Sequence, residues 1–139
     1  MRQASVTLSF QTKGRGLVEI TGDVAGWTHE QNMEAGLLTL FCRHTSASLL
    51  IQENAARAVR TDLEAFFERI APEDPDAYDH DDEGPDDMPA HLRTALTGVQ
   101  LSIPLLGGRL ALGTWQGVYL FEHRRRPHER QIVAHLIGE

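Results

Sequence analysis

Apolar and polar residues alternate along the first eleven positions, which is the period-two pattern of a strand with one covered face. Val6, Leu8 and Phe10 fall on the covered face, with small polar residues between them. The run ends at Lys13–Gly16, a segment whose two glycines tolerate the positive φ angles of a tight turn. We therefore expect Leu17–Ile20 to return as the second strand of a hairpin.

Further segments of strand type follow later in the chain. Leu37–Cys42 is apolar on both faces, which is typical of a strand in the middle of a sheet. Val99–Leu105 alternates again, and the Gly107-Gly108 pair after it predicts a hairpin turn. The remaining predicted strands are Ser48–Gln52, Arg109–Leu112, Gly117–Glu122 and Arg130–Ile137.

Three segments show the period of helices. The clearest is Asn54–Ile70, where apolar residues recur along one stripe of the helix. Gly22–Met33 is predicted as a short helix with Asp23 as its N-cap, and Met88–Leu96 as another short helix. The stripe of the long helix consists of Val59, Leu63, Phe66, Phe67 and Ile70.

The order of these elements decides the fold class. Strands and helices follow one another without a regular strand–helix–strand rhythm, which favours an α+β fold with a mostly antiparallel sheet. The 139 residues are the length of one domain, and no linker or repeat divides them. We therefore expect a single compact domain over residues 1–139, with a few packed helices.

Composition indicates where in the cell the protein is expected and whether it binds a membrane. Hydrophobic residues make up 41% of the chain, but no apolar run approaches the roughly 20 residues that span a bilayer, so no membrane partner is expected. The first ten residues lack the apolar core of a signal peptide, and Cys42 has no second cysteine to pair with. A cytoplasmic location is therefore expected, with Cys42 as a buried, unreactive thiol.

Charge is distributed unevenly along the chain. The net charge is −7, and nine acidic residues lie between Glu73 and Asp87 without a Lys or Arg among them. The basic counterpart is Glu122–Arg130, whose His123 and His128 we assign to a basic surface or to a contact between subunits. Because the chain is acidic overall and no aromatic residue interleaves these arginines, nucleic acid is not an expected partner.

The segment YDHDDEGPDDMPAH, residues 78–91, combines two histidines with six carboxylates. Such side chains ligate divalent cations, but an acidic run is also often a solvated loop, and most of these carboxylates are expected in water. Three imidazoles from His44, His80 and His91 would suit zinc. Imidazole with carboxylates, Glu83 first among them, would suit a harder cation such as magnesium, and the spacing does not choose between these.

Four segments of the chain together resemble a known family: CRHTSASLLIQENA, YDHDDEGPDDMPAHL, IPLLGGRLALGTWQG and VYLFEHRRRPHERQIVAHLIGE. In this order and at these spacings they resemble the YjbQ-like family, often described as secondary thiamine-phosphate synthases. The resemblance runs nearly end to end. It implies a compact α+β fold that assembles as a homotrimer, with a metal in some members, and it strengthens His44 and His91 because HTSASL and AHL match best.

Chemistry and resemblance together lead to one main functional hypothesis. It is a metal-dependent enzyme acting on a phosphorylated small molecule, with thiamine-phosphate synthase-type activity as a main or a side reaction. His44, His80 and His91 are the candidate catalytic residues and, with Glu83, the candidate ligands of a zinc or magnesium ion. The alternative is a non-catalytic protein that binds a metal or a phosphorylated metabolite.

A second group of residues is predicted to hold the substrate's phosphates. Hydroxyls, backbone N–H groups and guanidinium groups bind phosphate oxygens, although small hydroxyl residues at a strand end also form ordinary turns. The predicted phosphate-binding residues are Thr45, Ser46, Ser48, Gln116 and Arg124.

Overall fold

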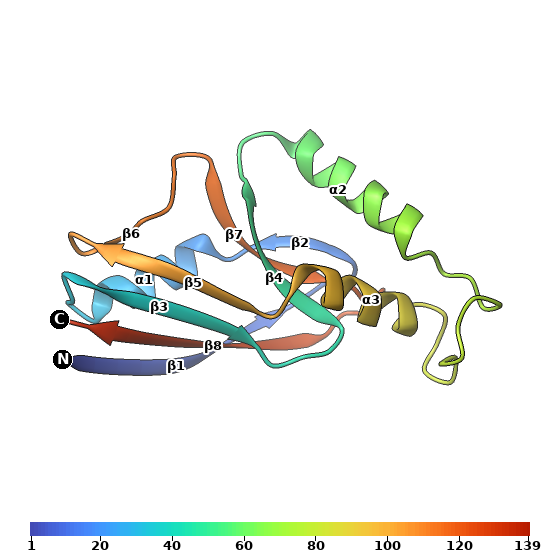
Figure 1. The fold of residues 1–139 in the computed structure, drawn as a ribbon, viewed down its shortest axis with the longest axis horizontal. Coiled ribbons are helices and arrows are strands. Elements are labelled where there is room, and N and C mark those ends of the chain that lie inside the picture. The colour runs from blue at the N-terminus through green and yellow to red at the C-terminus, as the bar shows by residue number, and fades with distance from the viewer.

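The computed structural model describes residues 1–139 and contains two antiparallel sheets (Figure 1). The larger sheet has five strands in the order β1-β8-β3-β5-β6. Strand β8 (Glu129–Gly138) pairs along its whole length with β1 (Arg2–Gln11) and, on its other edge, with β3 (Ala35–Cys42). Beyond β3 lie β5 (Gln100–Leu106) and the short β6 (Arg109–Leu110).

The smaller sheet has three strands in the order β2-β7-β4. Its central strand β7 (Gln116–Glu122) pairs with β2 (Gly16–Glu19) on one edge and with β4 (Ala47–Glu53) on the other. Every pairing in both sheets is antiparallel, and the helices do not alternate with the strands. The fold is therefore α+β, as predicted.

Three helices complete the fold. Helix α1 (Thr21–Glu30) contacts β6 and β7, and α3 (Asp87–Thr97) contacts β4. Helix α2 (Arg57–Ile70) follows β4 and leans away from the sheets, and the loop after it leads into α3 at one extremity of the molecule (Figure 1). None of the three helices has the length and apolar character needed to cross a membrane.

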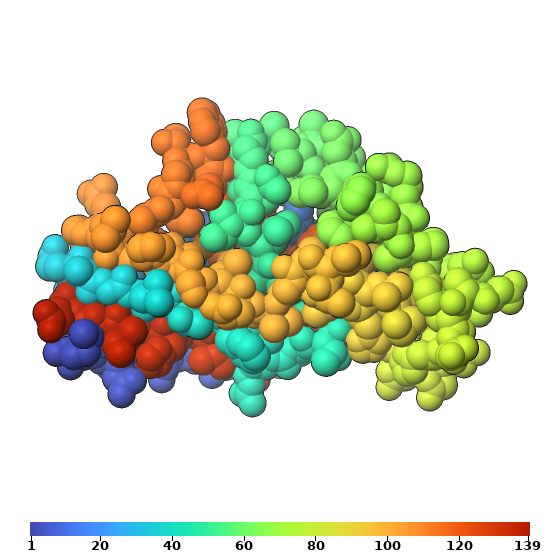
Figure 2. All heavy atoms as spheres, viewed as in Figure 1, coloured from blue at the N-terminus to red at the C-terminus, as the bar shows by residue number.

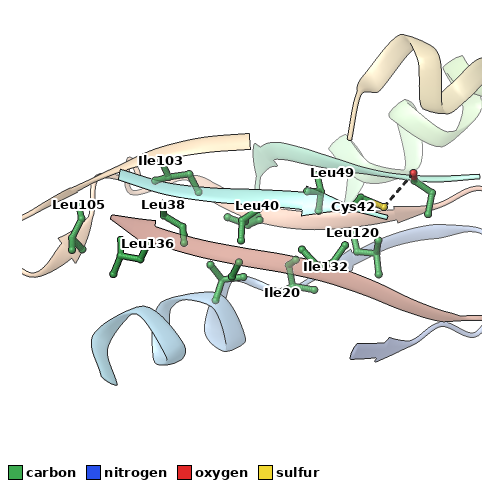
Figure 3. Close-up of a cluster of buried hydrophobic side chains, with 14 of the residues drawn as sticks. Ile20, Leu38, Leu40, Cys42, Leu49, Ile103, Leu105, Leu120, Ile132 and Leu136 are labelled. Atoms are coloured by element: carbon green, nitrogen blue, oxygen red, sulfur yellow. Dashed lines mark hydrogen bonds between the residues drawn. The ribbon is translucent and has the colours of Figure 1, made fainter. Parts of the chain in front are cut away.

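The hydrophobic core lies between the two sheets and α1 (Figure 3). Alternate residues of each strand point into it because successive side chains of a strand face opposite sides. Cys42 is buried there with its thiol 3.4 Å from the carbonyl oxygen of Ala47, and burial raises the pKa of this thiol, as expected for an unreactive cysteine. The fully buried core side chains include Ile20, Leu38, Leu40, Leu49, Leu105, Leu120, Ile132 and Leu136.

The predicted hairpin between the first two strands is wrong. Strand β1 pairs with β8 in the larger sheet, whereas β2 pairs with β7 in the smaller one. The glycines at positions 14 and 16 do adopt positive φ, but they carry the chain from one sheet to the other. A turn pattern fixes only local geometry, and the ten-residue partner of β1 lies more than a hundred residues away. The Gly107-Gly108 hairpin between β5 and β6 is confirmed.

Two predicted burial patterns are only half right. Residues Leu37–Cys42 do lie inside the larger sheet, but Leu37 and Phe41 point to its outer face and are 41% and 47% exposed. On α2, Phe67 is the one buried residue of the predicted stripe, while Phe66 and Ile70 are exposed. The apolar side chains of these two faces thus remain partly open to solvent.

Helix α1 begins earlier than predicted, so Asp23 is not its N-cap. The cap position is Ile20, with no side-chain cap bond, and Asp23 lies in the first turn. The first turn is instead anchored by Thr21, whose hydroxyl oxygen accepts a 2.8 Å hydrogen bond from the backbone N–H of Val118 in β7. Contact with the neighbouring strand thus replaces the local cap.

Candidate metal centre

The acidic stretch ends in a cluster around one buried carboxylate, Asp87. Asp87 begins α3, and His91 follows four residues later on the same face of the helix. The Nε2 atom of His91 lies 3.0 Å from Oδ2 of Asp87, and Nε2 of His80, from the loop before the helix, lies 2.7 Å from the same oxygen. One carboxylate oxygen therefore faces two imidazoles.

Glu83 adds a fourth ligand atom to the cluster. Its Oε2 lies 3.4 Å from Nε2 of His80. One ligand atom from each of His80, Glu83, Asp87 and His91 lies within 4.8 Å of the other three. Two imidazole nitrogens and two carboxylate oxygens at such spacing are a donor set that fits a first-row divalent cation after small side-chain shifts.

The second nitrogen of His91 fixes the orientation of its ring. Nδ1 lies 3.0 Å from the backbone oxygen of Thr45, and a carbonyl oxygen only accepts hydrogen bonds, so Nδ1 carries a proton and donates it. Nε2 is then the nitrogen that remains to bind a cation in the neutral ring. Metal-binding histidines characteristically donate their other N–H to a carbonyl or carboxylate in this way.

Arg124, just after β7, holds the acidic side of the cluster. Its Nε donates to Asp86 at 3.0 Å, its Nη1 to Asp87 at 2.8 Å and its Nη2 to the backbone oxygen of Glu83 at 3.0 Å. Burial opposes ionisation of Asp86 and Asp87, but hydrogen bonds and positive charges outweigh it, and the pKa of each carboxyl is lowered. Both carboxylates are thus kept in the ionised form that ligates cations.

The pKa of His80 is raised, whereas the pKa of its partner Asp87 is lowered. The hydrogen bond to Asp87 is the main cause that raises the pKa of His80, with smaller contributions from the charges of Asp82 and Glu83. A cation at the cluster would compete with this proton for the same nitrogen, so binding is expected to strengthen as pH rises.

His44 does not join this cluster. Its Nε2 accepts a 2.8 Å hydrogen bond from the backbone N–H of Gln131, and burial is the main cause that lowers its pKa. His44 instead lines a pocket of about 610 Å³ together with His91 and Thr45. The structure thus brings His80, His91 and Glu83 of the predicted ligands together, and Asp87 completes the set in place of His44. The other lining residues are Phe41, Cys42, Arg43, Thr94, Ala95 and Val99.

The five predicted phosphate-binding residues do not converge on one pocket. Thr45 borders the pocket beside His91, and Arg124 is engaged with Asp86 and Asp87. The hydroxyl of Ser46 accepts a 3.0 Å bond from Arg130, and the fully buried Ser48 hydroxyl lies 2.8 Å from Nε2 of His123. Gln116 caps a turn far from these residues by accepting the Gly113 N–H at 2.8 Å.

Asp86 and Asp87 are the two residues of the cluster region that the sequence analysis did not single out. Most carboxylates of the stretch were expected in water, but these two side chains are 10% and 3% exposed. The signal that could have revealed Asp87 is its spacing from His91, since residues four apart at the start of a helix share a face. Asp86 carries no such pattern, because its partner Arg124 is distant in the sequence.

A buried ion pair joins the two sheets close to this cluster. Glu122 at the end of β7 is fully buried and accepts hydrogen bonds from Arg130 of β8 and, at 2.6 Å, from Thr12 after β1. Its other oxygen accepts the backbone N–H groups of His123 and Arg124. His123, assigned above to a basic surface or a subunit contact, is 0% exposed, because it follows directly on this buried strand end.

The fold and the cluster together define an α+β protein with a histidine–carboxylate centre at the start of a helix. The family model described as "UPF0047 protein YjbQ-like" matches residues 6–139. The chain therefore belongs to this family, as its motifs indicated.

Named relatives support the assignment. The chain is 49% identical over 138 residues to UPF0047 protein sll1880 of Synechocystis, covering 99% of this chain and 94% of that protein. It is 45% identical over 139 residues to UPF0047 protein YjbQ of Salmonella typhimurium, covering 99% and 98% of the two chains.

Solved structures show the same fold. A conserved hypothetical protein from Thermus thermophilus matches with a TM-score of 0.83 and 36% identity, over 95% of this chain and 99% of that one. An uncharacterised YjbQ/UPF0047 protein from Clostridium acetobutylicum matches with a TM-score of 0.87 and 29% identity, over 95% and 99%. None of these names states a reaction.

Proposed function

We propose that this chain is a metal-dependent enzyme acting on a phosphorylated small molecule, with the metal bound by His80, Glu83, Asp87 and His91. The observation that carries the proposal is the orientation of His91. Its Nδ1 is committed to the Thr45 carbonyl while its Nε2 faces the buried Asp87 carboxylate. In a loop whose carboxylates are all solvated, none of them would be buried between two imidazoles and an arginine, as Asp87 is.

The ligand types favour zinc or a similar first-row ion over magnesium. Imidazole suits zinc, whereas magnesium prefers an octahedral shell of oxygen atoms with several waters. Two of the four proposed ligands are imidazoles, and Asp87 is almost fully buried. Glu83 is exposed, so the fourth position is the one most open to exchange with a substrate oxygen.

The pocket beside the cluster is the proposed substrate site. It shares His91 with the cluster, and its wall combines apolar side chains with Arg43, His44 and Thr45. His44 therefore becomes a candidate substrate contact, and Arg43, which is exposed, a candidate partner of a phosphate. A divalent cation would supply positive charge to a phosphate oxygen placed between the pocket and the cluster.

The reaction suggested by the family resemblance is a transfer of thiamine-phosphate synthase type. A thiazole-phosphate nitrogen attacks the methylene carbon of a pyrimidine diphosphate, a C–N bond forms, the C–O bond breaks and pyrophosphate departs. Such a reaction needs alignment of two molecules and neutralisation of the leaving group more than a protein nucleophile. The pocket residues would align the substrates, and Arg43 would approach the leaving phosphates.

Metal content tests the first part of the proposal. After zinc loading and dialysis, the wild type is expected to retain about one metal per chain by elemental analysis, and Asp87→Asn and His91→Ala to lose it. His44→Ala is expected to keep the metal, because His44 lies outside the cluster. His135→Ala is the matched control, because His135 of β8 contacts Gln3 of β1 and takes no part in the cluster. A wild type without stoichiometric metal under any loading condition overturns the proposal.

Turnover tests the second part. When the thiazole phosphate and the pyrimidine diphosphate are supplied, wild type and His135→Ala are expected to release pyrophosphate. Asp87→Asn is expected to release none. Metal retention without pyrophosphate release would overturn the thiamine-phosphate synthase-type reaction and favour the alternative of a non-catalytic metal- or metabolite-binding protein. The homotrimer expected from the resemblance stays a prediction that sedimentation equilibrium would check.

A further inference from the structure

Arg93 is a buried cation without a counter-ion in direct contact. It lies on α3, is 2% exposed, and takes part in none of the ion pairs within 4.0 Å. Its Nε is buried with no hydrogen-bond partner. An arginine stays protonated in proteins, so burial of its charge is unfavourable unless an anion compensates it.

Two neighbouring residues also have buried donor or acceptor atoms without partners. These atoms are Nε of Arg15 and Nδ1 of His123. Gly16 pairs with Glu122 across β2 and β7, so Arg15 and His123 are neighbours at the ends of these strands. Arg93 lies beside them, because the Thr97 hydroxyl is 2.7 Å from the Arg93 backbone oxygen and 2.6 Å from the Ser48 hydroxyl, which contacts Nε2 of His123. Three unpartnered nitrogens thus gather in one region, where native structures leave few such groups.

The region lies between α2, α3 and β2. Burial, followed by the charge of Arg15, lowers the pKa of Arg93, and the charges of Glu68 and Glu64 on α2 oppose that effect. A Cβ atom at Gly16, the first residue of β2, would lie 3.0 Å from the Glu64 carboxylate, so α2 reaches across to this strand. Figure 2 shows a hollow bounded by β4, α2 and α3, with atoms of the N-terminal strands and β7 at its floor.

A basic pocket adjoins the same region. It measures about 490 Å³, Arg15 is part of its wall, and its other charged lining residues are Lys13 and Arg125. One nearby carboxylate, Glu73, pairs with both Arg15 and Arg125. Lys13 and Arg93 form no ion pair within 4.0 Å, although Glu64 and Glu68 lie on the neighbouring α2, so two cations of this region have no directly paired carboxylate.

From these contacts we infer that Arg93 forms a second ligand site, which binds a phosphate group with help from Arg15 and His123. A guanidinium presents N–H donors in a fork that matches phosphate oxygens, and the Nε of Arg15 and an N–H at Nδ1 of His123 would donate to the same group. His123 reaches the donor state when Ser48 donates its hydroxyl proton to Nε2, which lies 2.8 Å away.

This site is separate from the proposed metal centre. His91 and Arg93 are two residues apart, which places them about 200° apart around the helix axis. One face of α3 thus carries the histidine–carboxylate cluster, and another carries the phosphate site. The inference does not depend on a metal and is testable in protein treated with EDTA.

Calorimetric titration with inorganic phosphate, at an ionic strength held constant with chloride, tests the site. The wild type is expected to bind saturably, as purified and after EDTA treatment. Arg93→Met is expected to weaken binding on the order of 100-fold, because charge-assisted hydrogen bonds are lost. It should fold at least as well as wild type in phosphate-free buffer, since an unpaired buried charge is removed. The control Arg69→Met, on the exposed side of α2, should bind normally.

Two further measurements distinguish phosphate binding at this site from non-specific binding of anions to the basic surface. Glu64→Gln is expected to tighten phosphate binding, because it removes a competing carboxylate near Arg93. The imidazole nitrogen signals of His123 are expected to shift on phosphate addition in wild type and to stay unchanged in Arg93→Met. No saturable binding by the wild type, or equal binding by Arg93→Met, would overturn the inference. Binding of a phosphorylated metabolite but not of free phosphate would support it and identify the source of the group.

Discussion

His123 makes the stability of this fold depend on pH in a way that can be calculated. The ring is 0% exposed, its centroid lies 4.4 Å from that of Phe121, and its Nε2 contacts the Ser48 hydroxyl. Burial, followed by the charges of Arg93 and Arg130, lowers its pKa to about 3. In the unfolded chain the same imidazole has an ordinary pKa of about 6.5.

The sign of the effect follows from which state takes up the proton first. Because the folded pKa of His123 is depressed, the unfolded chain is protonated first as pH falls. The contribution of His123 is complete above pH 6.5 and is lost progressively down to about pH 3. Between pH 7 and pH 5 this single group is expected to lower the free energy of unfolding by about 2 kcal/mol.

Urea unfolding at pH 7, 6 and 5 in phosphate-free buffer measures this loss. His123→Gln removes the titrating ring, so its decline in stability is expected to be smaller than that of wild type by about 2 kcal/mol. His29→Gln, at an exposed histidine of α1, should decline like wild type. If His123→Gln and wild type lose the same stability across this range, His123 is not held neutral by burial and the reasoning fails.

Three other substitutions test the packing. Glu122→Ala leaves the buried Arg130 unpaired, so the free energy of unfolding in urea is expected to fall by about 3–5 kcal/mol. A fall below roughly 1 kcal/mol would contradict a buried pair. Gly138→Ala places a Cβ 2.1 Å from the Ala35 carbonyl oxygen, so the thermal midpoint should fall or folded protein should be absent. Gly26→Ala, with open space around it in α1, should stabilise by about 0.5–1 kcal/mol, and a fall in the midpoint would contradict that.

Local patterns predicted the elements of this fold well, because side-chain periodicity reflects which face is covered. The strand alternation before Gln11 and the helical period before Ile70 are both confirmed. The partition into two sheets was not predictable in this way, because β1 and β8 meet from opposite ends of the chain. The exposure of Phe41 and Phe66 was also not predictable, since an apolar pattern does not say whether its partner belongs to the same chain.

The candidate site was predictable in part. His80, Glu83 and His91 come together because they belong to one loop and the helix that follows it. Asp87 was missed because its acidic neighbours made the whole stretch look solvated, and Arg124, which keeps it ionised, comes from another part of the chain. His44 was placed in the cluster from its position at a strand end, but its ring turns to the Gln131 backbone instead.

The pairing of β1 with β8 also determines how the protein can be handled. The two ends of the chain lie beside each other, with the Met1 amino group 3.3 Å from the Glu139 side chain. In Figure 1 they stand at one extremity of the molecule, and the acidic loop that leads into α3 stands at the other. A tag or a surface anchor at either end would therefore leave the histidine–carboxylate cluster facing the solution, where its ligands can be titrated on immobilised protein.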